Sequence, residues 1–87
     1  MLPHPTLGPF WKSHQNDWMS QWSLQTRHGI YRVSRYNKDN NSLSFVTGNH
    51  GGTESIFPDN GHSDEEINRM ITNHHNKMEQ AHQRRNA

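Results

Sequence analysis

The chain has 87 residues, a formal net charge of +1 and a hydrophobic fraction of 28%. This length limits it to one small domain with one small core, and the near-neutral charge excludes the self-repulsion typical of many disordered chains. The absence of cysteine excludes disulfides and thiolate zinc sites, and it fits a cytoplasmic location.

Residues 1–10 contain three prolines and one glycine. Because proline fixes its own φ and favours extended backbone at the residue before it, we expect an extended Pro-rich arm. The arm is either a frayed terminus or a segment that docks on a partner through Leu2, Leu7 and Phe10. Residues 11–87 are expected to form a single small α+β domain.

All three tryptophans lie within residues 11–22. Trp11, Trp18 and Trp22 are spaced i, i+7 and i+11, which predicts a short helix with the three rings on one face. We interpret this stripe as core, since a chain poor in apolar residues needs its largest side chains inside. In the alternative interpretation one or two rings are interface anchors. A further alternative is that Trp22 opens a strand ended by the turn 27–29.

The clearest pattern predicts a β-hairpin. Residues 29–36 and 42–47 are rich in β-branched and aromatic side chains, and they flank a turn-forming cluster at 37–41. A third strand is expected over 53–57, where Pro58 ends it.

The hairpin register follows from a five-residue loop. The expected pairs are Tyr36 with Ser42, Val33 with Phe45, and Tyr31 with Thr47. This register separates apolar from polar side chains. The polar face then displays Arg32, Ser34, Tyr36, Ser42 and Ser44.

A polar helix is expected to begin at Ser63 and to run toward Arg84-Arg85. Ser63 and Glu66 match the capping box, and the two acids between them stand where the helix dipole favours negative charge. The apolar stripe of this helix consists of Ile67, Met70, Ile71, His74, Met78 and Ala81.

Together these elements predict an α+β fold. A small antiparallel sheet of about three strands carries the C-terminal helix, and a short Trp-bearing helix precedes the sheet. The expected core consists of Trp18, Trp22, Tyr31, Val33, Leu43, Phe45, Ile56, Ile67, Ile71 and Met78.

The chain contains eight histidines, so metal binding is the first chemical function to consider. His74 and His75 are adjacent, so on a helix they point about 100° apart and do not share one ion. The sequence contains no histidine pair at i, i+4 and no HExxH motif. Because nucleophile-elbow and phosphate-loop motifs are also missing, we expect no catalytic residue, no metal and no cofactor.

The order of residues in 49–77 resembles the tail of the HNH nucleases, through Asn49-His50-Gly51-Gly52, Asn68 and Asn73-His74-His75-Asn76-Lys77. The resemblance implies a ββα metal finger in which His50 is the base and Asn68 and His75 are supporting residues. The sequence departs from that family because Asn49 replaces the aspartate before the histidine. A metal-dependent nuclease is therefore an alternative function.

The polar side of the hairpin favours a second alternative. It would present Arg32 and Tyr36, with Lys38 at the tip and Arg27 at the base, and such residues suit phosphate contact and base stacking. Strands followed by a helix also resemble the AP2/integrase-type DNA-binding fold, whose sheet enters the major groove. That resemblance implies a sheet-based DNA- or RNA-binding domain.

The small size, the tryptophans and the polar rim favour a protein-binding surface. The chain is similar in size and character to phage and mobile-element inhibitors of host machinery, such as anti-CRISPR proteins. We therefore expect a non-enzymatic inhibitor or adaptor that occupies a surface of a nucleic-acid-handling protein complex, without a membrane partner, and with a homodimer as an open alternative. The expected contacts are Arg32, Tyr36, Lys38, Arg35 and Trp11.

Overall fold

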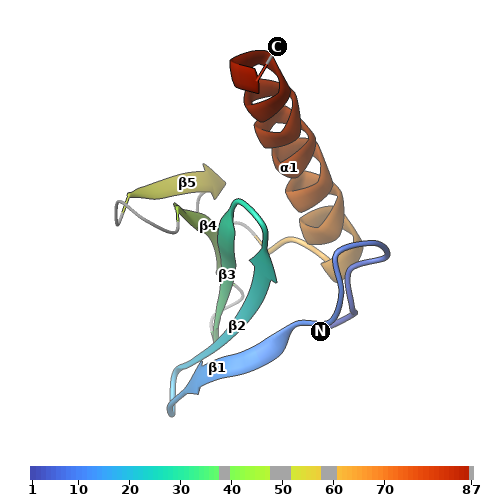
Figure 1. Ribbon diagram of the computed structural model, residues 1–87. Coiled ribbons are helices and arrows are strands. Elements are labelled where there is room, and N and C mark those ends of the chain that lie inside the picture. Colours follow the sequence, from blue (N-terminus) through green and yellow to red (C-terminus); the bar gives the residue numbers. More distant parts are fainter. Residues whose placement is uncertain (38–39, 48–51, 58–60, 87) are drawn as a thin grey trace.

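The structure is a computed structural model that describes residues 1–37, 40–47, 52–57 and 61–86. It consists of a five-stranded antiparallel sheet, with the strands in chain order, followed by one helix (Figure 1). The expected α+β class and the C-terminal helix are confirmed, but the expected sheet of about three strands is wrong, because residues 11–26 add two further strands. The elements are β1 (Trp11–Gln15), β2 (Met19–Thr26), β3 (Gly29–Tyr36), β4 (Asn41–Thr47), β5 (Thr53–Phe57) and α1 (Asp64–Asn86).

The expected N-terminal helix is wrong, because residues 11–22 belong to the hairpin β1–β2. Asn16 explains the difference. Its side-chain oxygen accepts hydrogen bonds from the backbone N–H groups of Trp18 and Met19 at 3.0 and 2.9 Å, which builds a turn where a helix would have continued. The alternative that placed Trp22 in a strand ended by the turn at 27–29 is confirmed for the strand and its end, but the strand begins at Met19 and not at Trp22.

The β3–β4 hairpin is confirmed, but its expected register is wrong by two residues. The observed pairs are Tyr31 with Phe45, Val33 with Leu43, and Arg35 with Asn41. The Tyr36 N–H donates to the Asn40 carbonyl at 3.0 Å, so the loop closes earlier than expected. Because side chains alternate with a period of two, a shift by two residues leaves each side chain on its expected face. The third strand is confirmed as β5.

Helix α1 begins where the capping motif predicts. The Ser63 hydroxyl accepts the Glu66 N–H at 3.3 Å, and the Glu66 carboxylate accepts a hydrogen bond from the same hydroxyl at 3.2 Å. Within the described residues, no helix combines the length and the apolar character needed to cross a membrane.

The core lies between α1 and one face of the sheet. Its buried hydrophobic residues are Leu24, Tyr31, Val33, Leu43, Phe45, Phe57, Ile67 and Ile71. Ile56 and Met78 pack against it, as expected, but are only partly buried. The expected core position of Trp18 is wrong, since it stands in the β1–β2 turn with 57% of its surface exposed, and Trp22 is only half-buried. Leu24 takes the place in β2 that we expected a tryptophan to fill.

Residues 1–10 fold against α1 of the same chain (Figure 1). His4 is buried, and its Nε2 atom lies 2.7 Å from the Thr72 hydroxyl, while the Asn68 side chain donates to the Pro3 carbonyl. The side chains of this segment that pack against the core are Met1, Leu7 and Phe10. The arm therefore adds apolar area to a small core.

Gly29 provides a direct test of the β2–β3 turn. Its φ is +153°, and a Cβ atom there would stand 2.2 Å from the Val46 carbonyl oxygen and 2.8 Å from the Phe45 ring. We expect Gly29→Ala to lower the free energy of unfolding by about 3 kcal/mol, measured by urea denaturation. Gly8→Ala is the matched control, since Gly8 also has positive φ but open space around its Cβ position, and should cost about 1 kcal/mol. Equal losses in the two variants would contradict this packing.

His4 makes docking of the arm sensitive to acid. Its Nδ1 atom accepts the backbone N–H of Leu7 at 3.0 Å, so the ring is neutral in this position, and burial lowers its pKa. In the unfolded chain the pKa of this histidine is about 6.5, so below that pH the unfolded state binds a proton more readily than the folded state does. The free energy of unfolding therefore decreases as the pH falls. We expect urea denaturation at pH 7.5 and pH 5 to show a smaller loss of stability in His4→Asn than in the wild type. His14→Asn, which changes an exposed histidine, is the control and should lose as much stability at pH 5 as the wild type. An equally large loss of stability in His4→Asn would contradict this role.

Candidate binding face and histidine cluster

One face of the sheet is left uncovered by the part of the chain that the structure describes. The helix and the N-terminal arm lie on the same side of the sheet as the core, and the opposite side faces away from both (Figure 1). We call this opposite side the open face. Antiparallel sheets commonly bury one face and leave the other to solvent. The open face carries mostly polar side chains, together with the partly buried Met19, Ile30 and Val46.

A row of directly paired residues crosses the open face from one edge to the other. Trp11 stands opposite Ser23, Ser23 opposite Arg32, Arg32 opposite Ser44, and Ser44 opposite Ser55. With neighbouring strands about 4.8 Å apart, the row spans roughly 19 Å. Trp11 is 47% exposed at the edge of the row, and Arg32 is exposed near its middle. The row therefore exposes an aromatic ring and a guanidinium to solvent.

A second aromatic feature lies where β2 begins and β3 ends. The rings of Trp18 and Tyr36 stack with their centroids 5.7 Å apart and their planes 16° from parallel. Together with Asn37 and Asn40 they line a shallow pocket. The Asn16 turn fixes the backbone beneath Trp18, so this large exposed side chain is held in place before any partner binds.

The open face is free of negative charge along its strands. Among the described strand residues that point to this side, none is a carboxylate. Glu54 belongs to the opposite side, where it lies opposite Phe45 and contacts His74 at 3.1 Å. The face is therefore complementary to a neutral or acidic surface.

The structure brings together three of the expected contact residues, Trp11, Arg32 and Tyr36. Arg35 lies on the helix side, where its guanidinium pairs with Asp64 and covers the Trp22 ring at 5.7 Å. It therefore does not share the open face. Lys38 lies outside the described residues, as does His50 of the HNH resemblance.

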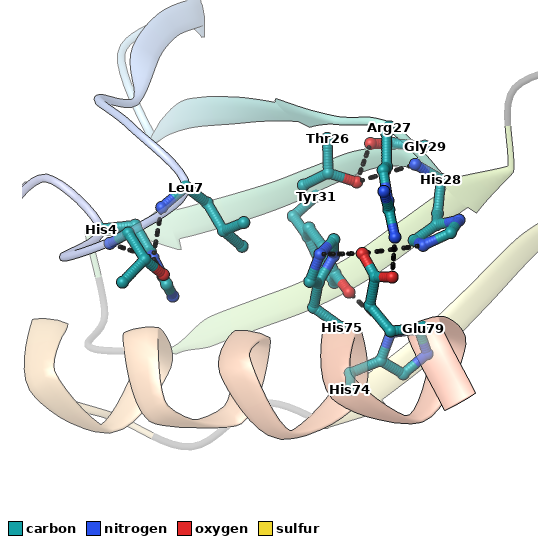
Figure 2. A network of polar contacts seen from close by, with 11 residues as sticks. His4, Leu7, Thr26, Arg27, His28, Gly29, Tyr31, His74, His75 and Glu79 are labelled. Carbon is teal, nitrogen blue, oxygen red and sulfur yellow. Dashed lines mark hydrogen bonds and ion pairs between the residues drawn. The ribbon is translucent and has the colours of Figure 1, made fainter. Parts of the chain in front are cut away.

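Histidines gather on the helix side at the β2–β3 turn (Figure 2). Glu79 of α1 is the centre of this group. Its Oε1 atom lies 3.3 Å from His28 Nε2 and 3.2 Å from His75 Nε2, while its Oε2 atom pairs with the guanidinium of Arg27. Thr26 shapes the turn that presents His28, because its hydroxyl accepts the His28 N–H and donates to the Gly29 carbonyl.

The two histidines of this cluster are largely removed from solvent, with 11% of each side chain exposed. Burial lowers the pKa of both His28 and His75, and the positive charge of Arg27 acts in the same direction. Both imidazoles are therefore neutral at pH 7. Sequence reasoning missed this cluster because it compared only histidines with one another, whereas the i, i+4 pair is His75 with Glu79.

A relay of polar contacts lies beside the cluster and runs from the buried Tyr31 through His74 to the exposed Glu54. The Tyr31 hydroxyl lies 2.8 Å from His74 Nδ1, and His74 Nε2 lies 3.1 Å from the Glu54 carboxylate. Tyr31 is fully buried and burial raises its pKa, so its hydroxyl stays protonated and out of reach of a substrate. The relay connects β3, β5 and α1 and is a structural element.

The remaining residues of the HNH resemblance have other partners in this fold. Asn68 is buried and holds the N-terminal arm through the Pro3 carbonyl, while His75 belongs to the cluster with His28 and Glu79. Comparison of the chain with family models, curated proteins and solved structures gives no match. Function must therefore be argued from the surface and the clusters themselves.

The relay, in which Tyr31 is buried, predicts a difference in stability between variants of the two tyrosines. Tyr31→Phe removes the partner of His74 Nδ1 inside the protein, and we expect it to lower the free energy of unfolding by about 1 kcal/mol. Tyr36→Phe is the matched control because Tyr36 is only partly buried, and its effect should stay within about 0.5 kcal/mol. Chemical denaturation of both variants measures the difference. A Tyr31→Phe variant as stable as the wild type would contradict the relay.

Proposed function

We propose that this protein is a non-enzymatic binding protein, an inhibitor or adaptor that uses its open face to occupy a surface of a larger nucleic-acid-handling complex. One observation carries the proposal. A chain this poor in apolar residues leaves Trp11 and Trp18 about half exposed, at 47% and 57%, while smaller side chains fill its core. Large exposed aromatic groups held by rigid strands and turns are typical of interface anchors.

The charges of the open face favour a protein as the direct partner. Arg32 is the cation of the described central row, and one neutralised phosphate contributes little to nucleic-acid affinity. Tryptophan, tyrosine and arginine are the side chains that dominate protein–protein hot spots. An acidic or neutral patch on a protein is therefore the complementary surface, and a cytoplasmic location belongs to the same proposal.

The roles of the buried polar residues support binding over catalysis. Tyr31 is fully buried and His74 is largely buried, so the Tyr31 hydroxyl of the relay is closed to solvent, whereas Glu54 contacts His74 from the surface with 63% of its side chain exposed. On the open face, Arg32 and Ser55 of the row described above are exposed, whereas Ser23 is buried, and the described strand residues of this face include no carboxylate. This arrangement supports recognition of a surface.

The experiment is capture from a nuclease-treated bacterial lysate on immobilised protein, followed by titration of the captured protein. We expect Trp11→Ala and Tyr36→Ala each to weaken its binding at least about tenfold, because loss of an aromatic anchor is costly. Arg32→Ala should weaken binding as well. Arg69→Ala, an exposed arginine on α1, is the matched control and should bind like the wild type. Binding unaffected by all three changes on the open face would refute the proposal.

Direct nucleic-acid binding is the second candidate, favoured by the Trp18–Tyr36 stack beside a face without carboxylates. Stacked aromatic rings suit unpaired bases. Titration with single-stranded oligonucleotides at low and moderate salt separates the candidates. Binding that falls steeply with salt and requires Trp18 would favour nucleic acid, whereas a protein complex that survives nuclease and moderate salt favours the first candidate.

A further inference from the structure

One face of α1 carries several side chains that can bind a metal. His75, Glu79 and His82 are spaced i, i+4 and i+7, so they lie along one side of the helix. The β2–β3 turn places His28 against this side, with its ring centroid 5.3 Å from that of His75 and 5.6 Å from that of His82. Residues from distant parts of the chain therefore converge here (Figure 2).

The spacing of the donor atoms fits a small divalent ion. Bonds of about 2.0–2.2 Å in a tetrahedral zinc site put neighbouring ligand atoms roughly 3.3–3.6 Å apart. His28 Nε2 and His75 Nε2 lie 3.3 and 3.2 Å from Glu79 Oε1, which matches two edges of such a tetrahedron. All three atoms lie within 4.8 Å of one another, so a small side-chain rotation completes the third edge.

The cluster also contains buried imidazole nitrogens that have no hydrogen-bond partner within the described part of the chain. Among the described residues, neither His28 Nε2 nor His75 Nδ1 has a hydrogen-bond partner, although both atoms are buried. His28 Nε2 lies 3.3 Å from Glu79 Oε1, but the angles between the two groups do not allow a hydrogen bond. Because buried polar atoms without partners are costly, an unpaired His28 Nε2 that faces a carboxylate and a second imidazole indicates a missing ligand.

We propose that His28, His75 and Glu79 form a binding site for a divalent transition-metal ion, with Zn²⁺ as the ion that best suits this donor set. Two imidazoles and one carboxylate are ligands that zinc uses, with the fourth position left to water or to His82. Arg27 binds the second carboxylate oxygen, so Oε1 stays turned toward the histidines. With 65% of its side chain exposed, Arg27 has a charge that water screens.

The bound ion would join the β2–β3 turn to the last third of α1. The last fully buried core residue of the helix is Ile71, and Met78, which packs against the core beside Glu79, is only partly buried. A metal at Glu79 would therefore stabilise a part of the helix that the core supports only weakly. This site is on the helix side of the sheet and does not depend on the binding role proposed for the open face.

Calorimetric titration of the full chain with ZnCl₂ at pH 7 tests the site. We expect one Zn²⁺ per chain. His28→Ala, His75→Ala and the isosteric Glu79→Gln should each weaken binding by at least about a hundredfold, because even outer-shell partners of a metal are worth 10–100-fold. His14→Ala, which removes an exposed histidine of β1, is the matched control and should bind like the wild type. No bound ion, or equal binding in all variants, would overturn the proposal.

A second readout separates loss of the site from loss of the fold. Circular dichroism of the metal-free variants establishes that each is folded, and Glu79→Gln retains the size of the side chain. Co²⁺ in place of Zn²⁺ should give the intense visible absorption of a four-coordinate site in the wild type and in His14→Ala. That absorption should be lost in a folded Glu79→Gln. A spectrum of hydrated Co²⁺ in the wild type would overturn the proposal.

Discussion

The packing of one helix against one face of the sheet is the interaction on which this structure depends. Ile67 and Ile71 are fully buried against strand residues such as Tyr31, Val33 and Phe45. Burying an aliphatic or aromatic side chain is worth about 1.5–3 kcal/mol, so a core this small leaves a narrow margin over conformational entropy. The described residues form no second helix for the other side of the sheet, and they leave that side open.

Polar links supplement this small core at the edges of the helix. Asp64 in the first turn of α1 pairs with Arg35 and accepts the Leu2 N–H, and both contacts lower the pKa of its carboxyl group. Near the other end, Glu79 pairs with Arg27 of the β2–β3 turn. These contacts hold the strands, the arm and the helix together where apolar area is missing. The same shortage of apolar area makes it notable that two tryptophans lie outside the core.

The sequence contained enough information for the elements with strong local signals. Ser63 and Glu66 determine the start of α1, and the alternation in β3 and β4 assigns side chains to the two faces correctly even though the register is shifted. The position of Trp18 could not be read from spacing, because an i, i+7 pattern of tryptophans also fits a hairpin. The Asn16 side chain favours the hairpin over the helix, because its oxygen accepts hydrogen bonds from the backbone of the β1–β2 turn.

The candidate sites could likewise be predicted from the sequence only in part. The open face was foreseen in part, because Arg32 and Tyr36 follow from strand alternation, whereas Arg35 alternates to the helix side and pairs there. The histidine cluster could not be foreseen from sequence spacing alone. It joins His28 of the β2–β3 turn to His75 of the helix. These two residues are 47 positions apart in the sequence, and only tertiary packing brings them together.

The central claim is that the open face is the surface that meets a partner. Hydroxyl-radical footprinting of the protein, free and bound to its captured partner, tests this most directly. The account predicts that oxidation of Trp11 and Trp18 is strongly reduced in the complex, while Met70 and Met78 of α1 are oxidised as in the free protein. Protection of the helix methionines with both tryptophans still fully reactive would contradict it.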